Sequence, residues 1–191
     1  MRDDAFAAVA WVRERLPYLT SGRVLDVGCG EGTFLRPGAV GLDIDVARLR
    51  AARVRSPLVV AGDVRALPFA AATFGTAYAH RMLNDTGDAD RALAEIARVL
   101  RDDGRLVVFT RARPPGAQAE AGTGGQVRGS ASPDRASARD RLDRWNGEAR
   151  LRRHFADVRT ETPALDDRAA LFIAARPLRG DRAAMPRGHG A

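Results

Sequence analysis

The chain of 191 residues has no lysine, a single cysteine and few aromatic residues. Because Cys29 has no second cysteine to pair with, an internal disulfide is excluded, and this usage is typical of a reducing compartment. No apolar run approaches the about 18 residues of a membrane span. Residues 1–4 also lack the apolar core of a secretion signal. These absences predict a cytoplasmic protein that does not interact with a membrane.

All 31 basic residues are therefore arginine, against 24 acids, and the formal net charge is +7. The excess lies in the second half of the chain. Residues 1–110 hold 15 arginines and 14 acids, whereas residues 111–191 hold 16 and 10. A nucleic-acid interface would be a clustered basic face with interleaved aromatic residues. This distribution disfavours a nucleic acid as partner, and RNA is retained only as an alternative.

Length and composition predict one α/β domain over residues 1–176. Within it, residues 113–137 consist mainly of Gly, Ala, Ser, Pro and Arg with hardly an apolar anchor, which predicts a flexible insertion. Residues 177–191 are polar and rich in Gly, Pro and Arg, which predicts a disordered tail.

Apolar residues alternate between helical and strand spacing along this domain. Helices are predicted at residues 4–18, 46–55, 88–100 and about 142–154, with a turn or two of helix at 33–36. Strands are predicted at residues 24–27, 39–42, 58–61, 74–79, 105–110 (after a turn at 102–104), 157–162 and 169–175. Strands that alternate with helices indicate a parallel, doubly wound sheet.

The most informative segment is Val-Leu-Asp-Val-Gly-Cys-Gly-Glu-Gly at residues 24–32. Its first half predicts a buried strand. The three alternate glycines predict a turn whose backbone approaches a ligand closely, because a Cβ would block both positive φ values and the close contact. A strand, a glycine turn and a helix start together form the nucleotide-binding corner of an α/β sheet.

Acids end each of the first three predicted strands: Asp26, Asp43 and Asp63. A lone acid at such a place is often only a helix cap, but in a parallel sheet all three ends meet at one edge. A carboxylate after the second strand suits the two hydroxyls of a ribose, and one after the third suits the amine of adenine. Asp26 would repel a pyrophosphate and suits a positively charged ligand, and the glycine spacing departs from that of dinucleotide sites. The pattern favours S-adenosylmethionine (SAM) over NAD.

Residues 24–110 resemble a class I SAM-dependent methyltransferase of the small "methyltransferase domain 11" type. The segments that carry the resemblance are residues 24–32, 41–43, 62–69, 91–100 and 104–108. The resemblance implies a Rossmann-like, doubly wound sheet of seven strands, mostly parallel with an antiparallel last strand. Residues 155–176 would supply strands six and seven. The helix after the glycine turn is unusually short for this family.

The resemblance also implies the residues that bind the cofactor: Asp26, Gly28, Cys29, Gly30, Asp43, Ile44, Asp63 and Val64. The glycines would line the methionine part, and Asp26 would support their loop. Asp43 would hold the ribose and Ile44 would flank the adenine. Asp63 and the backbone N–H of Val64 would contact the adenine edge.

Methyl transfer from a sulfonium is an in-line displacement, so alignment can supply much of the catalysis, and a base is needed only when the acceptor must lose a proton. His80 follows the fourth strand and is the candidate base, and the alternative is a histidine that only orients a loop. His154 is a weaker candidate near a helix end. Asn84 and Asp85 either touch substrate or turn the chain. No metal site is predicted.

The sequence therefore predicts a SAM-dependent methyltransferase that acts on an oxygen or nitrogen atom of a small molecule. Two alternatives remain. One is an RNA methyltransferase, which the arginine-rich second half favours, and the other is a non-catalytic SAM-binding or interaction module with the same fold. The residues do not define the acceptor, the role of the insertion or the oligomeric state.

Overall fold

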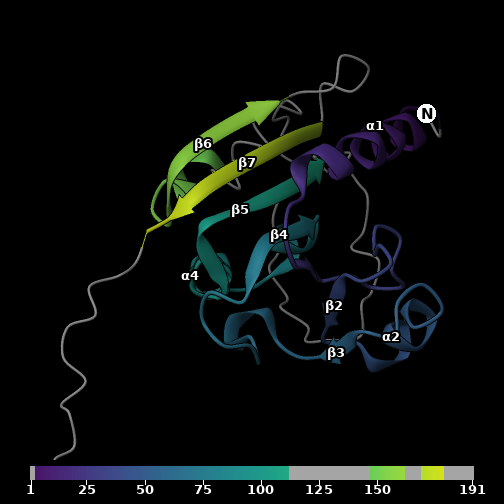
Figure 1. The fold of residues 1–191 in the computed structure, drawn as a ribbon. Helices are drawn as coiled ribbons and strands as arrows, with labels where there is room; N and C mark the ends of the chain where they lie inside the picture. Colours follow the sequence, from purple (N-terminus) through teal and green to yellow (C-terminus); the bar gives the residue numbers. More distant parts are fainter. Residues whose placement is uncertain (1–2, 112–146, 162–168, 179–191) are drawn as a thin grey trace, which may run out of the picture.

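A computed structural model describes residues 3–111, 147–161 and 169–178 of the chain (Figure 1). The predicted insertion at 113–137 and the part of the predicted tail after residue 178 lie outside the described residues. Within the described residues, no helix is long and apolar enough to cross a membrane.

Seven strands form one sheet in the order β3-β2-β1-β4-β5-β7-β6 (Figure 1). The strands are β1 (Val24–Val27), β2 (Val40–Asp43), β3 (Val59–Ala61), β4 (Phe74–His80), β5 (Leu100–Arg111), β6 (Phe155–Glu161) and β7 (Ala169–Pro177). The first five strands pair in parallel, whereas β7 is antiparallel to both β5 and β6. This confirms the predicted Rossmann-like sheet with its antiparallel last strand.

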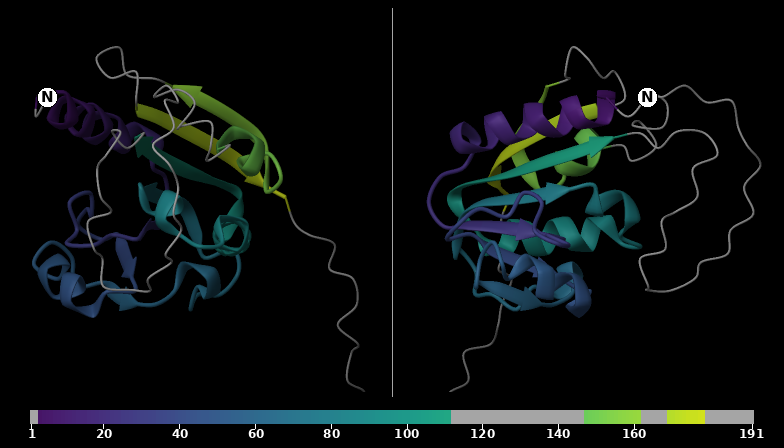
Figure 2. Two further views of the ribbon diagram at one scale, coloured as in Figure 1. Left: turned by 180° about the vertical axis from the view of Figure 1, so that it is seen from behind. Right: turned by 90° about the vertical axis from the view of Figure 1, so that its right-hand side faces the viewer.

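Helices pack on both faces of this sheet (Figure 2). The described helices are α1 (Asp3–Leu19), α2 (Val46–Ala52), the 3-10 turn η1 (Val64–Ala66), α3 (Met82–Asp85), α4 (Ala89–Val99) and α6 (Gly147–Leu151). Two of them begin at an acid that caps the first turn. Asp88 accepts the Arg91 N–H at 3.0 Å and caps α4, and Asp45 accepts the N–H groups of the first turn of α2.

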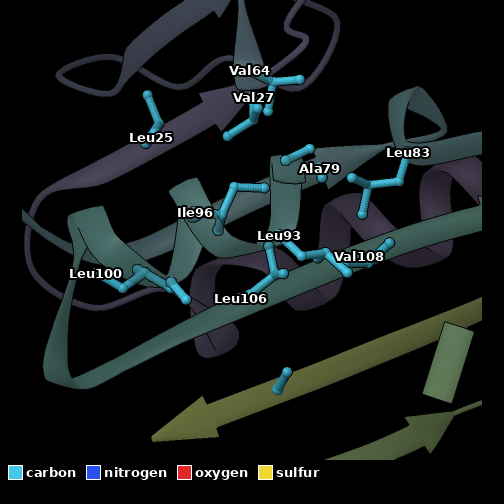
Figure 3. Close-up of a cluster of buried hydrophobic side chains, with 14 of the residues drawn as sticks. Leu25, Val27, Val64, Ala79, Leu83, Leu93, Ile96, Leu100, Leu106 and Val108 are labelled. Atoms are coloured by element: carbon cyan, nitrogen blue, oxygen red, sulfur yellow. The ribbon is translucent and has the colours of Figure 1, made fainter. Parts of the chain in front are cut away.

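The core divides between the two faces because side chains alternate along each strand. In β5, Leu106 and Val108 pack beneath α4, where they join Leu93 and Ile96 of that helix (Figure 3). Their neighbours Val107 and Phe109 pack on the opposite face beneath α1, with Val12, Leu16 and Leu19 of that helix. The sheet is therefore buried on both sides, as expected for parallel strands.

The segment after the glycine turn differs from prediction, since no helix forms at 33–36. Successive turns replace it: Gly32 N–H donates to the Cys29 carbonyl at 2.8 Å, and Leu35 N–H donates to the Gly32 carbonyl at 3.1 Å. Pro37 disfavours helical dihedrals at the residue before it, and no further helical turn fits before the next strand. Phe34 and Leu35 enter the core without a helix.

Three smaller differences concern element boundaries. Pro17 was predicted to end the first helix but lies inside α1, two residues before its end, where it removes one backbone hydrogen bond to the preceding turn. The turn predicted at 102–104 is an irregularity within β5: Leu100 pairs with Phe74, and the register then shifts so that Arg105 pairs with Thr76. The last strand ends at Pro177, which was predicted to start the tail.

Candidate cofactor site

The loop after β1 is closed onto β2 by backbone hydrogen bonds. The N–H groups of Gly28 and Cys29 both donate to the Leu42 carbonyl, at 2.7 and 3.0 Å. These bonds hold residues 28–32 at the carboxyl ends of the two strands. In open α/β sheets this edge is where ligands bind.

Glycine is required in this loop by its conformation and by its surroundings. Gly28, Gly30 and Gly32 have φ values of +69°, +53° and +78°. A Cβ added at Gly28 would lie 2.7 Å from the Cβ of Met82 at the start of α3. A side chain at Gly28 would therefore strain the backbone and displace α3. The loop presents its backbone, and not side chains, to a ligand.

Asp43 at the end of β2 holds the glycine loop. Its Oδ2 accepts the Gly30 N–H at 2.7 Å, and its Oδ1 accepts the Asp45 N–H at 2.9 Å. The residue is only 8% exposed. Because an ionised carboxylate has about four acceptor sites, each oxygen keeps capacity for one more donor. This arrangement suits the two neighbouring hydroxyls of a ribose.

Asp26 lies on the adjacent strand β1, where it pairs with Gly41, and it is buried without a full set of partners. Its Oδ2 has no hydrogen-bond partner in the structure. Burial, and after it the charge of Asp43, raises the pKa of Asp26 to about 7. A buried carboxylate in this state gains from a cationic donor nearby. These acceptor groups therefore suit a ligand with an ammonium group.

The residues predicted for the adenine side differ in what they expose. Ile44 follows Asp43 and leaves 70% of its surface exposed, which is unusual for an isoleucine and suits an apolar ring. Val64 buries its side chain in the core, so only its backbone is available. Val64 opens η1, where N–H groups lack an intrahelical acceptor.

Asp63 at the start of η1 is already engaged by Arg65. The Arg65 Nε lies 3.0 Å from each carboxylate oxygen, and its Nη2 lies 2.6 Å from Oδ2. Oδ1 also accepts the Arg65 backbone N–H at 2.8 Å. These hydrogen bonds lower the pKa of Asp63, so the carboxylate is ionised at neutral pH. An adenine amine would share this carboxylate with Arg65.

Cys29 contributes packing and backbone. Its side chain is buried with Leu35, Ala39, Leu49 and Ala52 on the α2 side of the sheet. Burial, together with the charges of Asp26 and Asp43, raises the pKa of the thiol to about 12. The thiol is therefore protonated and unreactive, and any contact with a cofactor at this position falls to the backbone.

His80 ends β4 within an aromatic cluster. Its ring stacks on Phe109 with centroids 5.4 Å apart and meets Phe34 edge-on at 4.5 Å. Burial, and after it the charge of Arg81, lowers the pKa of His80 to about 4. The imidazole is therefore neutral at pH 7. Arg81 next to it takes a left-handed φ of +60°, a strained conformation that is common at functional sites.

The remaining candidates are not brought to this cluster by any described contact. Asn84 and Asp85 lie in α3, and their side chains fall outside the described detail. His154 lies between α6 and β6, where its Nε2 is 3.7 Å from the Asp90 Oδ1. Within the described ranges no group of three His, Cys, Asp or Glu side chains could hold a metal ion.

Sequence reasoning missed two residues that shape the site, Phe34 and Met82. Phe34 replaces part of the absent helix and covers His80 and Tyr78. An apolar residue directly after a glycine turn is a usable signal for such a role. Met82 limits the space at Gly28 only because Arg81 turns the chain through a left-handed conformation, and no sequence pattern marks that turn.

The sheet order, the antiparallel β7 and the glycine loop between two strand-end acids define the class I methyltransferase fold, whose methyl donor is SAM. Residues 25–108 match the family described as "Methyltransferase domain". The chain thus contains a domain of this family, as its motifs predicted.

Two relatives each match about half of the chain. A demethylmenaquinone methyltransferase from Corynebacterium kroppenstedtii is 38% identical over 108 residues, which cover 53% of this chain and 47% of the relative. A malonyl-[acyl-carrier protein] O-methyltransferase from Legionella pneumophila is 34% identical over 113 residues, 51% of this chain and 39% of the relative. The chain spans about half or less of the length of these relatives.

Solved structures support the fold over more of the chain. A SAM-dependent methyltransferase from Thermotoga maritima, a possible histamine N-methyltransferase, matches with a TM-score of 0.61 at 18% identity and covers 90% of this chain and 89% of its own. One from Mesorhizobium loti matches with a TM-score of 0.61 at 20% identity and covers 87% and 96%. At this identity the likeness concerns the fold alone.

Proposed function

We propose that this protein transfers the methyl group of SAM to an oxygen or nitrogen atom of a small molecule. The observation that carries the proposal is the arrangement at the ends of β1 and β2. A glycine loop is held by Asp43, whose oxygens keep free acceptor capacity, and Asp26 lies beside it with an unpartnered, buried oxygen. These acceptor oxygens fit both the ribose hydroxyls and the ammonium group of SAM.

The residues of the chain would bind and orient the cofactor. The backbone at 28–30 lines the methionine part, Asp43 accepts from the ribose, and Ile44 packs on the adenine. Bound SAM supplies an electrophilic methyl group with its own leaving group. Catalysis then rests mainly on holding the acceptor in line with that methyl group and on excluding water.

His80 is the base we propose for an acceptor that must lose a proton. Its ring is neutral at pH 7 because burial lowers its pKa, and a neutral imidazole can accept a proton. The packing of Phe34 and Phe109 fixes the ring at the end of β4. The same low pKa makes it a weak base, because a general base is most effective when its pKa lies near the operating pH.

A small-molecule acceptor is supported by the relatives and by the surface. The relatives named above are methyltransferases of demethylmenaquinone and of a malonyl group on a carrier protein. Several exposed arginines are engaged in ion pairs: Arg65 with Asp63 at 2.6 Å, Arg101 with Asp103 at 2.7 Å and Arg152 with Glu148 at 2.8 Å. Paired guanidinium groups are less available to phosphates than free ones, which disfavours the RNA alternative.

Calorimetry with SAM and S-adenosylhomocysteine tests the cofactor assignment. Asp43→Ala should weaken binding by about 1–3 kcal/mol, since it removes a charged acceptor. Asp45→Ala is the matched control because it removes the neighbouring helix cap and should leave affinity nearly unchanged. Absence of SAM binding to the unaltered chain at high micromolar concentration would refute the proposal and favour a non-catalytic module.

Transfer of labelled methyl groups from SAM into metabolite extracts and into total RNA identifies the acceptor class. We expect label in the metabolite fraction. Label in RNA alone would overturn the small-molecule assignment. With an acceptor in hand, His80→Gln should lower kcat while leaving SAM affinity unchanged, and an unchanged kcat would reduce His80 to a packing residue.

A further inference from the structure

We propose that Glu95 and Arg98 of α4 are positioning residues for adenine recognition. Their side chains bind the segment that begins with Asp63 and Val64, an arrangement called the clamp below. This clamp fixes the position of the two groups that would contact the adenine. This inference rests on the proposed function, since it concerns the same cofactor. It assigns a role in that site to two residues of a helix whose side chains bind the chain after η1.

The clamp begins with a bidentate ion pair within α4. Arg98 Nε donates to Glu95 Oε1 at 2.7 Å, and Arg98 Nη2 donates to Glu95 Oε2 at 2.8 Å. The pair is partly buried, with side-chain exposures of 37% and 22%. A planar fork of this kind fixes both side chains in orientation as well as in position.

Both side chains then bind the backbone of the chain after η1. Glu95 Oε2 accepts the Leu67 N–H at 2.7 Å. Arg98 donates to the Leu67 carbonyl at 3.0 Å and to the Phe69 carbonyl at 2.8 Å. One N–H and two carbonyls of this irregular segment are thus satisfied by two charged side chains that are themselves locked together. Hydrogen bonds to charged groups are the stronger kind.

A third arginine of the same helix extends the contact toward the base-reading residues. Arg91 Nε donates to the Arg65 carbonyl at 3.0 Å. The side chain of Arg65 in turn holds the Asp63 carboxylate. The helix therefore holds residues 65, 67 and 69 from one side, and Asp63 and the Val64 N–H lie directly before them in the chain.

The position of this segment decides selectivity for the base. Adenine offers a donor, its exocyclic amine, next to an acceptor, its ring N1. An ionised Asp63 and the Val64 N–H are the complementary pair. Hypoxanthine offers the opposite hydrogen-bonding pattern, an acceptor next to a donor, because a carbonyl replaces the amine and N1 carries a hydrogen. A segment displaced by a fraction of an ångström would lose this discrimination before it lost the contacts of the loop and the ribose.

The test compares two cofactor products that differ only in the base, S-adenosyl-L-homocysteine and S-inosyl-L-homocysteine. The unaltered chain should prefer the adenosyl compound by roughly tenfold or more, as expected when a charged acceptor loses its donor. Glu95→Gln weakens the ion pair and the Leu67 contact. Arg98→Lys keeps the charge and loses the fork. Each should reduce the preference at least about threefold, mainly by weakening the adenosyl compound.

Two controls separate positioning from general damage. Glu148→Gln breaks a comparable Glu–Arg pair on α6, in which Arg152 donates to Glu148 at 2.8 Å, and should change neither affinity. Asp43→Ala should weaken both compounds by the same factor, because both carry the ribose. The use of two clamp variants keeps the test valid if one of them does not fold.

The outcomes are distinct. Equal weakening of both compounds in the clamp variants would overturn the inference, since that is what a merely structural role produces. An unchanged preference, or no preference in the unaltered chain, would overturn it as well while leaving the proposed function in place. If the unaltered chain binds neither compound, the proposed function itself fails.

Discussion

Asp26 lies one residue before the end of β1 and Asp43 ends β2, and yet their carboxylates are in opposite situations. Asp43 accepts two backbone N–H groups, whereas the Oδ2 of Asp26 is buried without a partner. The first residue stabilises the loop whether or not a ligand is bound. The unpartnered carboxylate of Asp26 destabilises the protein without cofactor, and only a bound cation would offset this destabilisation. Individual residues of the site can therefore be separated by their effect on stability.

Asp26→Asn should stabilise the protein in the absence of cofactor. Burial, followed by the charge of Asp43, raises the pKa of Asp26 to about 7 in the folded chain, against about 3.9 in an unfolded one. Because this pKa is higher in the folded state, ionisation destabilises the fold as pH rises from the lower value through the higher one. The gain should be small near pH 4 and on the order of 4 kcal/mol near pH 8. Urea unfolding at both pH values measures it, and an equal gain at both would contradict the assignment.

The same carboxylate should make SAM binding depend on pH. Below about pH 7 a growing share of the free protein carries a proton on Asp26 that must leave before the ammonium group is accommodated. The affinity for SAM should therefore rise between about pH 5.5 and 7 with release of a proton, which calorimetry in buffers of different ionisation enthalpy detects. In Asp26→Asn the affinity should be lower and this pH dependence absent.

The loop after β1 is the element whose shape the site depends on most. Gly28 and Gly38 both have positive φ values, +69° and +81°, but their surroundings differ. A Cβ at Gly28 would lie 2.7 Å from Met82 Cβ, whereas a Cβ at Gly38 would meet nothing within 4 Å. A comparison of substitutions at these two glycines therefore separates the effect of backbone strain from the effect of displacing α3.

Gly28→Ala should destabilise the fold by more than Gly38→Ala. The control carries only the strain of a left-handed alanine, about 1 kcal/mol, and the Gly28 variant adds the displacement of α3. Gly28→Ala should also abolish SAM binding measured by calorimetry, while Gly38→Ala keeps it. Equal losses of stability in the two variants would show that Met82 moves aside without a measurable loss of stability.

The elements that could be predicted from the sequence are those whose signals are local. Apolar periodicity placed the strands, and Asp88 marked the start of α4. The three acids could be assigned to one edge because parallel strands share a direction. What could not be predicted depends on contacts between distant parts of the chain. The irregularity in β5 depends on its pairing with β4. Side-chain packing decides that Arg65 binds the Asp63 carboxylate. It also decides that His80 is buried between Phe34 and Phe109.

At the scale of the whole molecule, cofactor binding should raise the stability of the entire domain, because the site joins the glycine loop, the end of β2 and the segment held by α4. SAM at about 100 times its Kd should add about 2.7 kcal/mol and raise Tm by roughly 5–10 °C for a chain of this size. Scanning calorimetry measures this shift. A Tm that does not move at saturating SAM would contradict binding at a site built into the fold.

The bond between Asp43 and the Gly30 amide has a consequence for how related sequences are interpreted. A descendant that no longer used SAM would still need an acid at this position to keep its loop, so the presence of that acid says little about activity. The buried carboxylate of Asp26 serves no such purpose in the free protein. Loss of the acid at position 26, with the acid at position 43 retained, is thus the substitution pattern expected of a relative that has kept the scaffold and abandoned the chemistry.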